Sequence, residues 1–119
     1  MSVRATDDRC DMGPLVTRAQ LDKVRDYIDQ GVAQGASLVV DGRRLELPAN
    51  RDGFFLGPCL FDHVKPDMQI YQDEIFGPVL CVVRVASLGD AMALIDAHPY
   101  GNGACIFTRD GESARHFAA

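Results

Sequence analysis

The feature that most constrains the fold is the apolar run V-L-C-V-V-R-V at residues 79–85. Apolar side chains at consecutive positions predict a strand that is buried on both faces, as in a parallel sheet. Ser87 can cap a helix that Pro99 ends, a second apolar run follows at residues 104–108, and Asp110 can cap a last helix. This order of strand, helix, strand and helix predicts an α/β domain with a right-handed crossover and an at least partly parallel sheet.

Upstream, the sequence predicts a helix over residues 18–33. Thr17 and Gln20 have the spacing of a capping box, in which the Thr hydroxyl and the Gln amide satisfy backbone donors of the first turn. Apolar residues then recur every three or four positions as one stripe: Leu21, Val24, Ile28 and Val32. Gly31 or Gly35 is expected to end the helix, because glycine adopts the left-handed C-cap conformation at little cost.

A hairpin is predicted after this helix. Residues 37–40 form a short strand-like run, Asp41-Gly42 is a two-residue turn signal, and residues 43–47 alternate polar and apolar side chains. Residues 54–61 are expected to be extended, and residues 64–73 are expected to be irregular.

The stretch Q-D-E-I-F-G-P-V at residues 72–79 raises the question of function. Two acids, an Ile-Phe pair and a Gly-Pro stop suit neither a helix nor the middle of a strand, so a loop is predicted. The stretch is either a plain turn into the next strand or a clamp that holds a ligand. Its own residues leave both possibilities open.

The amino-acid composition argues against several classes of function. A chain of 119 residues with 47% hydrophobic and 24% charged residues is typical of one globular domain. The net charge of -5 argues against a nucleic-acid-binding surface or an anionic-membrane surface. No apolar run reaches the length of a membrane span, so no membrane partner is expected.

The cysteines and histidines do not predict a metal site or a nucleophile. Both residue types are widely dispersed and no C-x-x-C occurs, so no metal is expected. Cys81 and Cys105 lie in apolar runs and are expected to be buried in a reducing compartment, which favours a cytoplasmic location. Cys10 and Cys59, like the other two, have no adjacent His or Lys, so all four are interpreted as structural thiols.

Three blocks together carry a family resemblance. D-E-I-F-G-P-V-L at residues 73–80 resembles the acidic-acidic-Ile-Phe-Gly-Pro segment of the NAD-dependent aldehyde dehydrogenase superfamily. Residues 12–42 resemble the helix-and-strand stretch downstream of that family's catalytic cysteine, and residues 99–118 resemble a later strand-helix segment. The resemblance implies that residues 1–119 are one partial domain, the part of a catalytic domain that follows the nucleophile, with a mixed or parallel sheet and flanking helices.

Two shorter motifs refine the resemblance. V-K-P-D-M at residues 64–68 and P-Y-G-N-G at residues 99–103 are similar to the methylmalonate-semialdehyde dehydrogenases, the CoA-acylating branch of valine and inositol catabolism. The chain departs from the family pattern at Asp73, where Glu is more usual, at Cys59, where Thr is common, and at His98, where Asn is frequent.

The resemblance assigns cofactor roles to two residues. It implies that Glu74 binds the nicotinamide-ribose hydroxyls of NAD and that Phe76 packs near the nicotinamide. An ionised carboxylate can accept hydrogen bonds from both vicinal hydroxyls, and an aromatic face can restrain the ring. Asp73 is interpreted as a surface acid or a cap, and Gly77-Pro78 as the turn into the strand.

The resemblance also implies a covalent mechanism with CoA as co-substrate. In the family, a cysteine thiolate attacks a small-molecule aldehyde, hydride passes to NAD, and CoA takes the acyl group from the thioester, with loss of CO2 in this branch. The nucleophile, the glycine-rich dinucleotide-binding domain and the oxyanion-hole Asn lie upstream of these blocks. No cysteine of the chain inherits the catalytic role, and the isolated chain is expected to be inactive and to bind no NAD.

The abrupt ends suggest a piece of a larger domain, which is expected to form homo-oligomers or to self-associate through exposed strand edges. Two alternatives remain open at this stage. The chain can be a segment of a non-acylating aldehyde dehydrogenase, or a stand-alone non-catalytic α/β module for binding or assembly.

Overall fold

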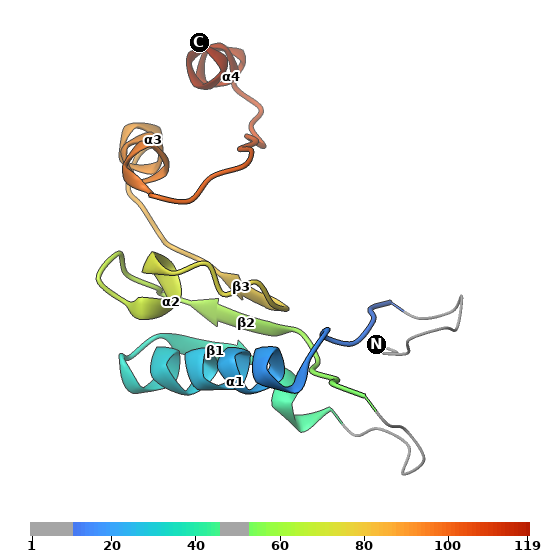
Figure 1. Ribbon diagram of the computed structural model, residues 1–119. Helices are drawn as coiled ribbons and strands as arrows, with labels where there is room; N and C mark the ends of the chain where they lie inside the picture. Colours follow the sequence, from blue (N-terminus) through green and yellow to red (C-terminus); the bar gives the residue numbers. More distant parts are fainter. Residues whose placement is uncertain (1–10, 46–52) are drawn as a thin grey trace. The chain divides into compact units, whose positions relative to one another are not determined.

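The computed structural model describes residues 11–45 and 53–119 (Figure 1). The elements are, in order, α1 (Arg18–Ala33), β1 (Ser37–Val40), the 3₁₀ helix η1 (Gly42–Arg44), β2 (Cys59–Asp62), α2 (Gln69–Gln72), β3 (Val79–Cys81), α3 (Leu88–Ala97) and α4 (Gly111–Ala118). The chain divides into two compact units, residues 1–83 and residues 84–119. The sheet belongs to the first unit, and α3 and α4 belong to the second.

Helix α1 has the bounds that its sequence predicts. Thr17 Oγ1 accepts a hydrogen bond of 3.1 Å from the backbone N–H of Gln20. At the other end Gly35 has a φ of 95°, and its N–H and that of Ala36 donate to the carbonyls of Val32 and Gly31. These two bonds form a Schellman motif, in which glycine relieves the strain of the left-handed position.

The buried stripe of α1 differs from the expected one in its last member. Leu21, Val24 and Ile28 are buried, whereas Val32 is exposed and Gly31 takes its place in the core. The absence of a side chain at Gly31 lets the ring of Phe61 on β2 and the tip of Ile70 on α2 approach the helix. The last turn of α1 therefore packs closely against the sheet.

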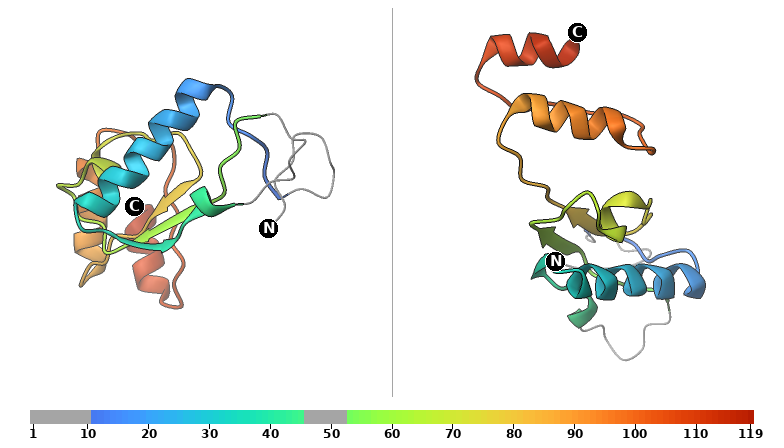
Figure 2. Two further views of the ribbon diagram at one scale, coloured as in Figure 1. Left: turned by 90° about the horizontal axis from the view of Figure 1, so that it is seen from below. Right: turned by 90° about the vertical axis from the view of Figure 1, so that its left-hand side faces the viewer.

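Strand β2 lies between the other two strands of a three-stranded sheet. It pairs antiparallel with β1, where Leu38 is opposite Phe61, and parallel with β3, where Phe61 is opposite Cys81. The expected α/β class with a mixed sheet is confirmed. Helix α1 covers one face of this sheet and also contacts α2 (Figure 2).

The core of the first unit lies between α1, β2 and α2. Phe61, Ile28 and Val24 are its largest fully buried side chains. Helix α2 brings Ile70 into this core, and Met68 just before it is also buried. Residues 64–73 were expected to be irregular, and that prediction misses α2, which is a single helical turn with two apolar anchors.

The predicted hairpin after β1 is wrong. Residues 42–44 form η1 and the antiparallel partner of β1 is β2, while Glu46 and Leu47 lie outside the described residues. Asp41 is the reason, because its carboxylate accepts from the backbone N–H of Arg43 at 3.1 Å and so caps a 3₁₀ turn. The same side chain that signalled a tight turn thus stabilises a short helix.

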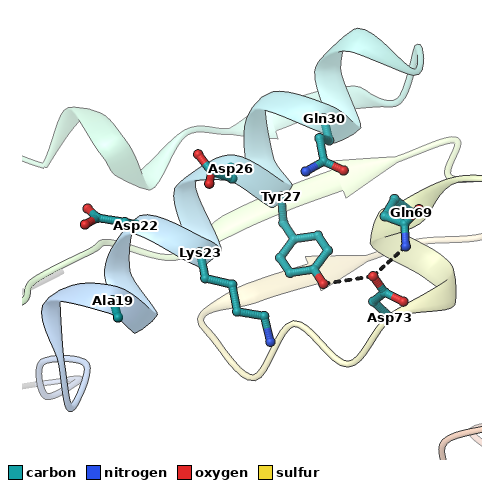
Figure 3. Close-up of a pocket in the computed structure, with 8 residues that line it drawn as sticks. All are labelled: Ala19, Asp22, Lys23, Asp26, Tyr27, Gln30, Gln69 and Asp73. Atoms are coloured by element: carbon teal, nitrogen blue, oxygen red, sulfur yellow. Dashed lines mark hydrogen bonds between the residues drawn. The ribbon is translucent and has the colours of Figure 1, made fainter.

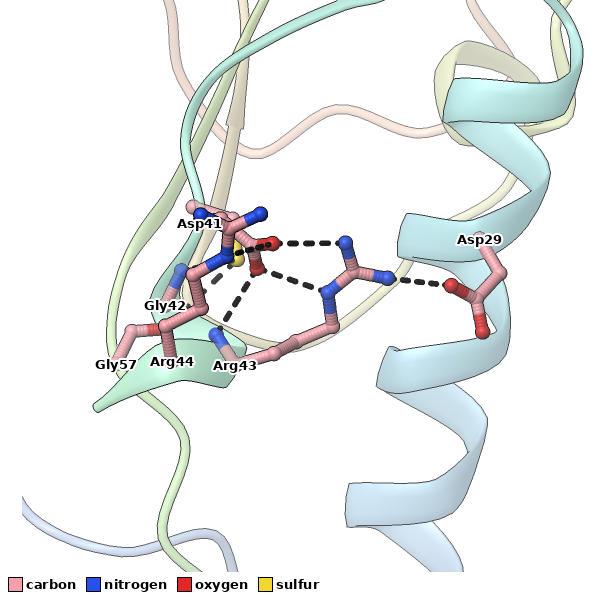
Figure 4. Close-up of polar contacts among 7 residues, drawn as sticks. Asp29, Asp41, Gly42, Arg43, Arg44 and Gly57 are labelled. Atoms are coloured by element: carbon pink, nitrogen blue, oxygen red, sulfur yellow. Dashed lines mark hydrogen bonds and ion pairs between the residues drawn. The ribbon is translucent and has the colours of Figure 1, made fainter. Parts of the chain in front are cut away.

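An ion-pair cluster ties η1 to α1 (Figure 4). The guanidinium of Arg43 donates to both carboxylate oxygens of Asp41, at 2.8 Å each, and to Asp29 on α1. The side chain of Arg43 is only 28% exposed and that of Asp41 only 16%. This bidentate pair is therefore less screened by water than an ordinary surface ion pair.

The cluster predicts an acid-sensitive contribution to stability. The hydrogen bond from Arg43 holds the pKa of Asp41 below its ordinary value of 3.8. A carboxyl group whose pKa is lower in the folded state stabilises the fold above its unfolded pKa, and this stabilisation is lost as the pH falls through the folded pKa. We expect Asp41→Asn to lower the Tm at pH 7 and to have a smaller effect below pH 3.8, as measured by thermal melts across this range.

Asp67→Asn, in an exposed turn, is the matched control for the Asp41 substitution. An Asp41→Asn variant whose Tm deficit is the same at pH 7 and at pH 3 would contradict the proposed contribution of the ion pair.

Strand β3 is shorter and more exposed than its sequence predicts. It spans only Val79–Cys81 of the run at residues 79–85, and Leu80 is 65% exposed. A run buried on both faces needs cover on each side, but among the described residues β3 has β2 as its sheet neighbour and lies at the edge. The expectation that this strand is buried is therefore wrong for the chain as described.

The second unit contains two capped helices and no strand among its residues 84–119. Ser87 Oγ accepts from the N–H of Asp90 at 3.1 Å, and Asp110 accepts from the N–H of Ser113 at 2.8 Å, so both predicted caps are confirmed. The predicted strand at residues 104–108 is wrong, and Phe107 is 94% exposed. An apolar run becomes a strand only when another strand satisfies its backbone groups, and this unit supplies none.

Candidate functional site

The loop at residues 73–77 is anchored at alternate residues. It joins α2 to the start of β3, and it lies beside α1 in the first unit. The side chain of Asp73 is hydrogen-bonded to other side chains, and Ile75 is buried in the core. Gly77 packs against α1. Glu74 and Phe76, the two residues between these anchors, are exposed. The loop is thus the place where both sequence-predicted site residues lie.

The first anchor is a carboxylate clasp at Asp73. Its Oδ2 accepts a hydrogen bond of 2.8 Å from the hydroxyl of Tyr27 on α1 and another from the side-chain amide of Gln69 on α2 (Figure 3). The bond from Gln69, followed by that from Tyr27, holds the pKa of Asp73 below its ordinary value. Asp73 is interpreted from the sequence as a surface acid or a cap. It is the C-cap residue of α2, and its side chain also links α1 and α2 to the loop.

The second anchor is Gln20, near the start of α1. Its side-chain Nε2 donates to the carbonyl oxygens of Ile75 at 3.1 Å and of Phe76 at 2.8 Å. The capping box is therefore only half confirmed, because the hydroxyl of Thr17 caps the helix while the amide of Gln20 binds the loop. A side chain that the local pattern assigned to the helix thus supports a segment 55 residues away.

Apolar packing completes the anchoring. Ile75 is buried in the core next to the residues of α1. A Cβ atom at Gly77 would lie 2.6 Å from Cγ2 of Val24, so the backbone here rests directly on α1. Ile75 and Gly77 thereby fix the side of the loop that faces the protein, and their neighbours face outward.

The two outward residues have complementary chemistry. Phe76 is 77% exposed and has a φ of 54°, a left-handed conformation that is strained for an aromatic residue. Glu74 is exposed and makes no hydrogen bond or ion pair with residues 11–45 or 53–119. An acceptor-only carboxylate and an apolar ring, two positions apart on an anchored loop, can bind a ligand that carries hydroxyls beside a flat ring.

A shallow depression lies on the α1 side of this loop. It has a volume of about 540 Å³ and is lined by Ala19, Asp22, Lys23, Asp26, Tyr27, Gln30, Gln69 and Asp73 (Figure 3). The ammonium group of Lys23 lies 5.6 Å from the ring centroid of Tyr27. The Asp73 clasp forms part of the lining, whereas Glu74 and Phe76 do not line it.

The described cysteines have different environments. Cys59 is buried, Cys81 is half-buried and Cys105 is exposed, so the expectation that Cys105 is buried is wrong. Burial raises the pKa of both Cys59 and Cys81, which favours the protonated thiol and makes them poor nucleophiles. Cys10 lies outside the described residues.

Two kinds of feature are absent from residues 11–45 and 53–119. No group of three or more His, Cys, Asp or Glu side chains there is arranged to hold a metal ion. None of the helices in the same ranges is both long and apolar enough to cross a membrane.

The sequence profile of the aldehyde dehydrogenase family matches residues 1–119. The chain belongs to this family. It is 67% identical over 107 residues to the malonate-semialdehyde dehydrogenase of Pseudomonas aeruginosa, which covers 90% of the chain and 22% of that protein. It is 44% identical over 108 residues to the mouse mitochondrial methylmalonate-semialdehyde/malonate-semialdehyde dehydrogenase, described as acylating, which covers 91% of the chain and 20% of that protein.

A solved aldehyde dehydrogenase structure is similar over almost all of the chain. It is a Sinorhizobium meliloti protein assigned as a methylmalonate-semialdehyde dehydrogenase and complexed with NAD. The TM-score is 0.93 with 51% identity, and the match covers 99% of this chain and 24% of that one. The chain therefore spans about a fifth of the length of the curated relatives it matches.

In this aldehyde dehydrogenase segment, the sequence motif located the loop but missed what supports it. Glu74 and Phe76 are both exposed on this loop. Their roles in binding NAD stay a prediction. The supports that were missed are side chains of α1 and α2: Gln20, Tyr27 and Gln69. Their only sequence signal is polarity next to the apolar stripe of α1 and next to the buried residues of α2.

Proposed function

We propose that the chain is the cofactor-clamping segment of an NAD-dependent, CoA-acylating aldehyde dehydrogenase. The proposed reaction converts malonate or methylmalonate semialdehyde, NAD and CoA into acetyl-CoA or propionyl-CoA, NADH and CO2. The similarity to the Pseudomonas aeruginosa and mouse enzymes supports this substrate class. The observation that carries the proposal is the anchored loop that presents Glu74 and Phe76 outward.

The residues present fit NAD. The carboxylate of Glu74 is available to accept both hydroxyls of a ribose, because no described residue occupies it. The ring of Phe76 is an apolar surface left in water, which a flat ring can cover. When bound, NAD supplies the acceptor for the substrate's hydride. The chain's own contribution is to hold the ribose and to orient the ring beside it.

The covalent chemistry belongs to residues that the family carries upstream of this segment. Burial raises the pKa of Cys59 and of Cys81, which supports giving neither of these two residues the catalytic role. One ribose contact and one ring contact are also too few for stable binding of a dinucleotide. We therefore propose that residues 1–119 alone neither bind NAD stably nor catalyse the oxidation of an aldehyde.

The test uses a chimeric enzyme, in which this chain replaces the matching segment of the Pseudomonas aeruginosa relative. We expect the chimeric enzyme to reduce NAD with malonate semialdehyde and CoA, and the 119-residue chain to produce no NADH under the same conditions. In the chimeric enzyme, Glu74→Gln should raise the KM for NAD at least tenfold, because a hydrogen bond to a charged group is worth roughly 1.5–3 kcal/mol. Initial rates at varied NAD measure this effect.

Glu112→Gln makes the same chemical change at an exposed glutamate of α4, and it should leave the KM for NAD unchanged. An unaltered KM for NAD in Glu74→Gln would reject the clamp. Turnover of the chimeric enzyme that is independent of CoA would instead favour a non-acylating dehydrogenase, the alternative within the same fold.

A further inference from the structure

The position of Glu74 depends on its neighbours in the loop. It makes no hydrogen bond or ion pair with the described part of the chain, so its location depends on the residues beside it. On one side Gln20 holds the carbonyls of Ile75 and Phe76, and on the other side Asp73 is the nearest anchor. Consecutive Cα atoms are only about 3.8 Å apart, so a change at Asp73 is transmitted directly to Glu74.

Asp73 is held within a closed network of side chains from two helices. The hydroxyl of Tyr27 on α1 and the amide of Gln69 on α2 both donate to Oδ2 of Asp73. The backbone N–H of Gln69 in turn donates to Oε1 of Gln34, the C-cap residue of α1, at 2.8 Å. Helix α1 thus holds the acid directly through Tyr27 and indirectly through Gln34 and α2.

We propose that Tyr27 is a positioning residue for the cofactor: by holding Asp73, its hydroxyl fixes the place of Glu74 at the ribose. This inference rests on the role proposed above for Glu74. Tyr27 suits the task because its hydroxyl stands at the end of a rigid ring on the middle of a regular helix. Only two rotatable bonds separate that hydroxyl from the backbone. The side chain therefore has few conformations, and the distance between α1 and the loop is well defined.

The geometry predicts which contact with NAD depends on Tyr27. Without the Tyr27 hydroxyl, the loop keeps the Gln20 anchor near Phe76 and the bonds between Asp73 and Gln69, but it loses the direct bond from α1 to Asp73. We therefore expect the loss of the Tyr27 hydroxyl to weaken the contact of Glu74 with the ribose more than the contact of Phe76 with the nicotinamide ring. A residue with a purely structural role would instead lower the stability and the amount of active enzyme without a selective change in NAD binding.

The experiment is Tyr27→Phe in the chimeric enzyme, which removes one oxygen atom and keeps the ring. We expect the KM for NAD to rise about fivefold, less than for Glu74→Gln, with the KM values for malonate semialdehyde and CoA within about twofold of the unsubstituted chimeric enzyme. Tyr100→Phe, at an exposed tyrosine of the second unit, is the matched control and should change none of these values. A Tm measured for each variant separates kinetic effects from unfolding.

A double-mutant cycle tests whether Tyr27 acts through Asp73. Tyr27→Phe should raise the KM for NAD in the wild-type background and add nothing in an Asp73→Ala background, where its partner is absent. Asp73→Glu restores a carboxylate and should recover a larger share of NAD affinity than Asp73→Ala. Independent effects of Tyr27→Phe and Asp73→Ala would overturn the proposed route.

The outcomes separate this inference from the proposed function. If Glu74→Gln raises the KM for NAD but Tyr27→Phe leaves it unchanged, the role of Tyr27 is rejected and the clamp stands. If neither substitution changes that KM, the clamp itself is rejected. A fall in Tm with equal changes in all three KM values would assign Tyr27 to the stability of the fold and would also overturn the inference.

Discussion

Phe61→Ala is expected to destabilise the first unit by about 3–5 kcal/mol, the range found when large buried aromatic side chains are truncated. Phe61 is fully buried on the middle strand, and its ring packs against the backbone of α1 at Gly31. It also pairs with Leu38 on β1 and with Cys81 on β3. The truncation would leave a cavity where helix and sheet meet.

A loss of this size is a large part of the stability of a small domain, which totals about 5–15 kcal/mol. The measurement is urea denaturation of the 119-residue chain followed by far-UV circular dichroism. Phe107→Ala is the matched control, because Phe107 is the same residue type at 94% exposure, and its effect should stay within about 0.5 kcal/mol. Equal effects of the two substitutions would show that the core does not centre on β2.

The parts of the fold that local sequence determines were predicted well. Helix α1 has its predicted bounds because a cap, an apolar stripe and a C-terminal glycine all indicate one helix. The caps at Ser87 and Asp110 were also found, since a cap needs only a side chain and a backbone N–H three residues away. These contacts form whatever lies elsewhere in the chain.

The strands were predicted less well because a strand needs a neighbour. Residues 79–85 and 104–108 have strand-like composition, yet β3 covers only Val79–Cys81 and the second run forms no strand in the described structure. The register of β2 between β1 and β3 is likewise not encoded in the local pattern of Cys59–Asp62. A sequence pattern shows that a segment can form a strand, but whether it does so depends on the strands that are available to pair with it.

The candidate site likewise has one part that the local sequence predicts and one part that depends on the fold. Gly77-Pro78 and the two acids before Ile75 predicted a loop, and the family resemblance drew attention to Glu74 and Phe76. The bonds from Gln20 and Tyr27 reach the loop across 46 to 56 positions, so no local pattern contains them. The motif therefore identifies which residues the loop presents, while the fold supplies the hydrogen bonds that anchor the loop.

Gly42→Ala is expected to be the most damaging small substitution, because two backbone segments touch at this position. A Cβ atom at Gly42 would lie 2.0 Å from the carbonyl oxygen of Gly57 and 2.2 Å from its carbon (Figure 4). Both are backbone atoms, so no side chain can rotate away, and the segments must separate. The bonds at risk are the one from the N–H of Gly57 to the carbonyl of Gly42, at 3.0 Å, and the one from the N–H of Gly42 to Sγ of Cys59, at 3.2 Å.

Separation at Gly42 would also disturb the ion-pair cluster, because Arg43 is the next residue and its guanidinium spans Asp41 and Asp29. We expect a loss of about 3 kcal/mol or more in the free energy of unfolding, at the upper end of what overpacking costs. Gly13→Ala is the control, since nothing lies within 4 Å of a Cβ there, and urea denaturation of both variants measures the difference. A Gly42→Ala variant as stable as Gly13→Ala would mean that η1 and the segment at Gly57 do not pack against each other.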